Sequence, residues 1–90
     1  MSFENPERRA IRIELAGIRD LIESIEAGDQ NVAYADTSDS MDSLDALLGE
    51  NEWYQESLVK RRSASQKIMG GDKSGLQDIL AWIREVESKL

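Results

Sequence analysis

The chain has 90 residues and contains neither cysteine nor histidine. Without cysteine no disulfide can form, and without histidine the ordinary zinc and haem sites lose their usual ligands. A domain this small buries a modest share of its surface and commonly needs a disulfide, a metal or oligomerisation for stability. The composition therefore favours burial against other protein chains, with a well-packed helical core as the alternative.

Long apolar runs are also absent, since no stretch approaches the roughly 20 residues that span a bilayer. Residues 1–12 lack an apolar block behind a basic head, so they do not resemble a signal peptide. We therefore expect a soluble protein made in the cytoplasm, with no membrane partner. The net charge of −7 disfavours contacts with phosphates, and we expect no sequence-specific nucleic-acid partner.

Apolar residues recur every three or four positions along three segments, which places them on one face of a helix. The three stripes are Ile11, Leu15, Ile18, Ile22 and Ile25; Leu44, Leu47, Leu48, Tyr54 and Leu58; and Leu76, Ile79, Ile83, Val86 and Leu90. We predict a mainly α single domain over 1–90. Its three amphipathic helices cover about residues 6–27, 43–69 and 74–89, and the first two are antiparallel.

Residues at the predicted boundaries support these helices. Pro6 suits the first position of a helix, and Gly28 suits a left-handed helix stop. Ser74 begins a capping-box pattern at the start of the last helix. The Gly-Gly pair within residues 70–73 predicts a hinge before that helix.

Residues 31–41 fit two structures. Val32 and Tyr34 alternate with alanines, as in a short strand, and serine and aspartate residues typical of turns follow them. The segment is therefore predicted to form either a short β-hairpin or an ordered loop.

No motif in the chain indicates catalysis or metal binding. Carboxylates are plentiful, but none lies in an apolar setting that would raise its pKa. Asp36, Asp39, Asp42 and Asp45 recur every three residues, yet the glycine and the position-twelve glutamate of a calcium loop are missing. We expect no enzymatic activity, no metal and no cofactor.

Charge is divided along the chain. Residues 29–56 contain eight acidic side chains and no basic one, whereas residues 58–73 contain five basic side chains and one acidic. A molecule with one negative and one positive region can associate head-to-tail or in a ring. The alternative is that both regions are solvated faces.

Three features suggest contacts with partner chains. Trp53 and Trp82 are large aromatic residues, a type enriched at interfaces. A basic triplet at residues 60–62 suits an acidic partner, and the narrow last stripe suits helix–helix packing. The predicted partner-binding residues are Trp53, Lys60, Arg61, Arg62, Leu76, Ile79, Trp82 and Ile83.

Two segments resemble a known family. Residues 15–28 read L-A-G-I-R-D-L-I-E-S-I-E-A-G, and residues 31–50 read N-V-A-Y-A-D-T-S-D-S-M-D-S-L-D-A-L-L-G-E. This pattern is similar to small tailed-phage head–tail joining (connector) proteins of the lambda W type, over about residues 8–60. That family has a helix ending in glycine, a short hairpin, and a second helix that opens on a Ser-Leu-Asp turn. The matching positions are Ala27, Gly28, Val32, Tyr34, Asp36, Thr37, Ser38, Ser43, Leu44, Asp45 and Leu47.

The resemblance implies a structural protein of the virion, placed in a ring between the portal and the tail. Its partners would be portal and tail proteins and further copies of itself. The residues alone indicate a non-enzymatic acidic helical protein that acts through protein–protein contacts. They leave two alternatives: a regulatory module whose acidic surface mimics DNA or inhibits a host protein, and a freestanding helical-bundle adaptor.

Overall fold

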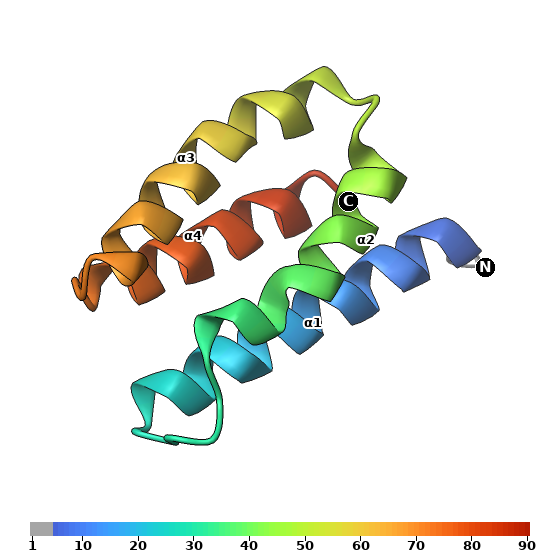
Figure 1. Cartoon of the computed structure of the whole chain (residues 1–90). Coiled ribbons are helices and arrows are strands. Elements are labelled where there is room, and N and C mark those ends of the chain that lie inside the picture. The colour runs from blue at the N-terminus through green and yellow to red at the C-terminus, as the bar shows by residue number, and fades with distance from the viewer. Residues whose placement is uncertain (1–4) are drawn as a thin grey trace.

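The computed structural model describes residues 5–90. In this range the chain forms four α-helices and one short 3-10 helix, and it contains no strand (Figure 1). The elements are α1 (Pro6–Glu26), η1 (Tyr34–Thr37), α2 (Ser38–Leu48), α3 (Glu52–Met69) and α4 (Ser74–Ser88). The prediction of a mainly α fold is confirmed.

The helix ends follow the local sequence. The Asn5 side chain accepts a hydrogen bond from the Glu7 N–H at 2.7 Å and so caps α1. Gly28 has a φ of 91°, and the backbone bonds around it form a Schellman motif. Gly71, with a φ of 86°, closes α3 in the same way. Both predicted glycine stops are therefore confirmed.

The helices form two antiparallel hairpins, α1–α2 and α3–α4, as Figure 1 shows. The hairpins meet where α1 packs on α4, and an ion pair between Arg19 and Glu87 crosses this junction. The predicted antiparallel arrangement is confirmed for the part of the second helix that lies in α2. It is wrong for residues 52–69, because α3 runs in the same direction as α1.

The predicted helix over residues 43–69 is in fact two helices, separated by a corner at residues 49–51. Gly49 has low helix propensity, and Asn51 takes an extended backbone with φ −87° and ψ 124°. The Gln55 side chain closes the corner by donating to the Gly49 carbonyl at 2.7 Å. Helix α2 packs on α1, and the corner turns the chain so that α3 packs on α4 instead.

The hairpin predicted as one alternative for residues 31–41 is wrong, because this segment forms η1 and the start of α2. The Asp36 carboxylate accepts a hydrogen bond from the Ala33 N–H at 2.9 Å. The Thr37 hydroxyl donates to the Tyr34 carbonyl at 2.7 Å. These side chains bond to nearby backbone groups, which favours a helix start over a strand ladder.

All three predicted stripes contribute to one core. The buried apolar residues are Ile11, Leu15, Ile18, Ile22, Met41, Leu44, Leu48, Tyr54, Ala64, Leu76, Ile79, Trp82, Ile83 and Val86. Most of them lie on α1 and α4. Helix α3 adds only Tyr54 and Ala64, so polar contacts take a larger part in holding it in place.

Helices α3 and α4 approach each other closely at Gly75. A Cβ on this residue would lie 2.6 Å from the Ala64 carbonyl oxygen and 2.8 Å from Cγ1 of Ile68. Real Cβ atoms do not make such short contacts, so any larger residue would push the helices apart. Gly17, within α1, is different, because the nearest atom to its Cβ would be Ser40 Oγ at 3.8 Å.

We expect Gly75→Ala to lower the free energy of unfolding by about 1–3 kcal/mol, because the core between α3 and α4 must open to admit the methyl group. Gly17→Ala should instead raise it by up to about 1 kcal/mol, since alanine favours the helix and has room. Urea unfolding followed by circular dichroism measures both changes. Similar effects of the two substitutions would contradict the close approach at Gly75.

Candidate functional site

Helices α2 and α3 lie on the same side of the molecule but hardly touch, because each packs on a different partner helix (Figure 1). A cavity of about 680 Å³, open to solvent, lies between them. Its walls come from residues 34–42 of η1 and α2 and from residues 58–69 of α3. We call it the α2–α3 groove.

The lining of the α2–α3 groove is mostly apolar. Met41 and Leu58 are buried or half-buried, whereas Met69 at one end is 76 % exposed. Methionine side chains are flexible and polarisable, so they adapt to varied apolar surfaces. The groove therefore offers apolar area that the chain itself leaves uncovered.

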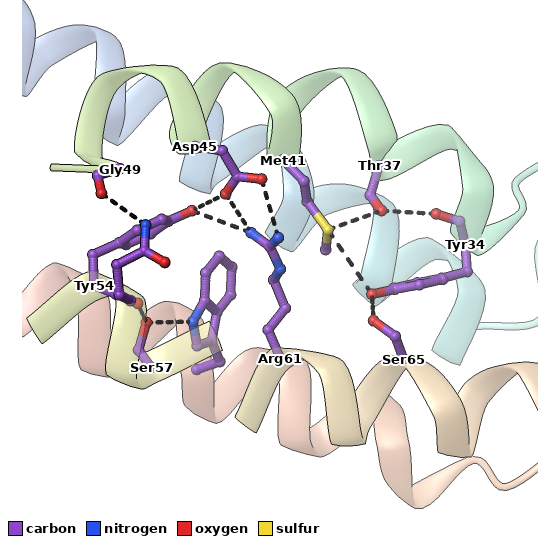
Figure 2. A network of polar contacts seen from close by, with 11 residues as sticks. Tyr34, Thr37, Met41, Asp45, Gly49, Tyr54, Ser57, Arg61 and Ser65 are labelled. Carbon is purple, nitrogen blue, oxygen red and sulfur yellow. Dashed lines mark hydrogen bonds and ion pairs between the residues drawn. The ribbon is translucent and has the colours of Figure 1, made fainter. Parts of the chain in front are cut away.

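A polar network, which we call the Arg61 bridge, crosses the groove (Figure 2). Arg61 on α3 donates to both carboxylate oxygens of Asp45 on α2, at 2.9 and 3.2 Å. The Tyr54 hydroxyl donates to Asp45 Oδ1 at 2.7 Å and accepts from Arg61 at 3.1 Å. Bidentate pairing of this kind fixes geometry as well as charge. The bridge sets the distance between α2 and α3.

The Arg61 bridge also reaches α4. The guanidinium carbon of Arg61 lies 5.2 Å from the centre of a Trp82 ring, a cation–π distance. The Trp82 indole N–H donates to the Ser57 hydroxyl at 3.1 Å, and Ser57 donates to the Tyr54 carbonyl at 2.6 Å. No buried side-chain polar atom among residues 5–90 lacks a hydrogen-bond partner. The bridge thus joins three helices.

A second contact closes one end of the groove, where Figure 2 shows Tyr34 and Ser65 pointing toward each other. Their hydroxyls form a hydrogen bond between η1 and α3. The Tyr34 hydroxyl also lies 3.9 Å from the sulfur of Met41. This contact fixes η1 at the rim of the groove.

The bridge moves the pKa values of its groups away from neutrality. Partial burial alone would raise the pKa of Asp45, but hydrogen bonds from Arg61 and Tyr54 outweigh it and lower this pKa. Burial and the bond to Asp45 raise the pKa of Tyr54. Desolvation alone would lower the pKa of Arg61, yet its bond to Asp45 raises it. At neutral pH Asp45 and Arg61 therefore stay charged and Tyr54 stays neutral, and a network with fixed protonation states suits a structural role.

Residues 5–90 contain no group of three or more histidine, cysteine, aspartate or glutamate side chains placed to hold a metal ion. None of the helices described here is long and apolar enough to cross a membrane.

The predicted basic triplet points in three directions, because successive residues of a helix are about 100° apart. Lys60 faces α4 and pairs with Glu85 at 3.1 Å. Arg61 turns inward to form the bridge. Arg62 is exposed at the α2–α3 groove. Arg61 is therefore occupied within the chain, whereas Arg62 and the Lys60 side chain, which is 68 % exposed, lie at the surface.

The predicted partner contacts on the last helix need correction. The structure buries Leu76, Ile79, Trp82 and Ile83 in the chain's own core. These side chains pack within the same chain, where the Trp82 indole donates to Ser57 of α3, and they do not project toward a partner. Trp53 is half-buried against the core, with its ring 6.0 Å from that of Tyr54.

Sequence reasoning missed Asp45, Tyr34 and Ser65 as parts of one site. In the sequence Asp45 belongs to an evenly spaced acidic series and to the Ser-Leu-Asp turn, and neither pattern indicates a pairing with Arg61. Sixteen positions separate it from Arg61, and no local pattern joins residues so far apart. Met69 carried a weak signal, because it and Ile68 are apolar at the end of a helix whose preceding residues are mostly polar.

Comparisons with known proteins give no relative for this chain. No protein-family model matches it, and no curated protein or solved structure is significantly similar to it. The site must therefore be interpreted from its own geometry.

We expect the Arg61 bridge to make stability depend on pH in the acidic range. A lowered pKa in the folded state means that Asp45 stabilises the protein above its unfolded pKa of about 4, and that this contribution is lost as the pH falls through the folded pKa. Because the Asp45 side chain is 40 % exposed, solvent screening limits the contribution to about 1 kcal/mol or less.

Thermal unfolding between about pH 6 and pH 2 tests this expectation. Asp45→Asn should lose less stability than the wild type over that range, while Asp20→Asn, on an exposed position of α1, should follow the wild type. Identical pH profiles for the wild type and Asp45→Asn would contradict the proposed role of the bridge.

Proposed function

We propose that this chain is a non-enzymatic structural or adaptor protein, and that the α2–α3 groove is the surface through which it binds a polypeptide. The observation that carries the proposal is an open, mostly apolar groove between two helices that are bridged but not packed. Such a groove suits the apolar face of a helix from a protein partner. Met69 provides exposed apolar area at its end.

The charges around the groove argue against the DNA-mimic alternative. A DNA mimic requires a continuous negative surface. Here Asp45 is paired with Arg61, and Asp42 lines the same groove as Arg62. At the groove, negative charge on α2 therefore lies beside positive charge on α3, which suits a partner with charges of both signs.

The resemblance to phage head–tail joining proteins supports a narrower form of this proposal. The stop of α1 at Gly28 agrees with that family. The Ser-Leu-Asp sequence at residues 43–45 adds no support, because it lies in the middle of α2 and not at the start of a helix. Residues 31–41 add no support, because they form η1 and the start of α2 where that family has a hairpin. In this narrower form the groove binds a portal protein, a tail protein or another copy of the chain.

The general proposal predicts a photocrosslink that depends on position. Met69→p-benzoylphenylalanine places a reactive ketone in the groove, and Ile13→p-benzoylphenylalanine places it on α1, where Ile13 is 62 % exposed and outside the groove. In the cells that produce the protein, irradiation should give a protein adduct from position 69 and not from position 13. Mass spectrometry then identifies the adduct.

A matched variant sharpens this experiment. Ser38→Trp adds a bulky ring to the groove wall from an exposed position, so it should abolish the adduct formed at position 69. The absence of any protein adduct at position 69 would overturn the proposal, as would an adduct that Ser38→Trp leaves unchanged.

The narrower form predicts a defect in particle assembly. If a phage carries this gene, disruption of the gene should yield DNA-filled heads without tails, because the joint between portal and tail is missing. Electron microscopy of lysates, with the gene restored from a plasmid as the control, measures this. Normally tailed particles would refute the phage role and leave the general proposal standing.

A further inference from the structure

We propose that the occupant of the α2–α3 groove is a second copy of this chain, docked by a two-fold axis that runs along the groove. In this arrangement α2 of each copy lies over α3 of the other copy. The inference rests on the proposed function and names its partner.

The first argument is that the two walls of the groove carry unsatisfied charges of opposite sign. Asp42 on α2 and Arg62 on α3 both line the groove, and both are exposed. Within residues 5–90 neither side chain forms a hydrogen bond or an ion pair. The residues of the Arg61 bridge form hydrogen bonds and an ion pair with one another. Asp42 and Arg62 are therefore the charged groove residues left to pair with a partner.

The two walls of the groove also complement each other under a two-fold rotation. A two-fold interface uses the same surface patch on both copies, so the patch must complement itself. Rotation about the groove axis places the acidic wall of one copy against the basic wall of the other, and the converse pairing follows automatically. An unrelated partner would need a basic group opposite the acidic wall and an acidic group opposite the basic wall. A second copy of the chain already carries both groups at these positions.

The third argument concerns apolar area. Met69 is the most exposed large apolar side chain of the described residues, and it lies at the end of the groove. In the two-fold arrangement the Met69 side chain of each copy covers the η1 end of the partner's groove. This contact would bury apolar surface that is open in the single chain, and burial of such surface is the main driving force for association.

The arrangement also accounts for the helical corner at residues 49–51. The corner places α2 and α3 next to each other with a gap between them, although each is anchored to a different helix. When the α2–α3 pair of a second copy lies across this gap, the two open grooves close into a four-helix bundle of two layers. Because the contact closes on itself, it yields a dimer and not a filament.

A charge-exchange experiment tests this model. Asp42→Arg gives a chain with two basic walls, and Arg62→Asp gives a chain with two acidic walls. Each variant alone should dimerise about 10-fold more weakly or worse, because each interface then contains two like-charged contacts. An equimolar mixture of the two variants should form a heterodimer, and the double variant Asp42→Arg/Arg62→Asp should dimerise like the wild type.

Sedimentation equilibrium and light scattering at micromolar to millimolar concentration measure these states. Asp20→Arg and Arg9→Asp make the same charge changes at exposed positions of α1, and they should leave the dimer intact. Circular dichroism checks that every variant is folded.

Three results would overturn the proposal: a monomeric wild type over the whole range, an assembly of more than two copies, or a mixture of variants that fails to associate. The photocrosslink at position 69 separates this failure from failure of the proposed function. An adduct with a different protein, together with a monomeric chain, refutes the second copy and leaves the groove as a binding surface. No adduct at all refutes both.

Discussion

The guanidinium of Arg61 joins α3 to α2 and so links the two helical hairpins at the groove. Helix α3 packs on α4 and makes little direct contact with α2, so its link to α2 runs mainly through the contacts that Arg61 makes with Asp45 and Tyr54. The Arg61 side chain is only 16 % exposed, and a charge with so little access to water is stable in the protein only when it is fully paired. The same side chain lies over Trp82, which belongs to the core of α4. The spacing of the groove walls thus follows from the pairing of one buried charge.

Much of the fold could be predicted because its signals are local. The apolar spacing of Ile11 to Ile22 and of Leu76 to Val86 requires one buried helix face each, and glycines mark the ends of α1 and α3. The corner at residues 49–51 could not be predicted in the same way. One glycine inside an apolar pattern is compatible with a continuous helix, and only tertiary packing decides that α3 turns toward α4. The alternation around Tyr34 likewise fits a short strand as well as an ordered loop, whereas the hydrogen bond from the Ala33 N–H to the Asp36 carboxylate favours a helix start.

The candidate site was less predictable, for a physical reason. A basic triplet and an acidic series were visible in the sequence, but their pairing depends on how two hairpins meet. Lys60, Arg61 and Arg62 are neighbours in the chain and yet face α4, the bridge and the open groove. The ridge of α4 shows the same limit. The spacing of its apolar residues requires that they be buried. Whether they pack against the same chain or another chain depends on the length and direction of α1 and α3.

The two-hairpin layout has a consequence for how the chain folds. Helices α3 and α4 are joined by a turn at residues 70–73 and make the most extensive helix contact in the described chain, between elements that follow each other in sequence. The α1–α2 pair is local in the same sense, whereas the α1–α4 contact joins distant segments. Contacts between helices that follow each other in sequence favour fast folding. We expect docking of the two hairpins, which brings together the distant helices α1 and α4, to be the slower step.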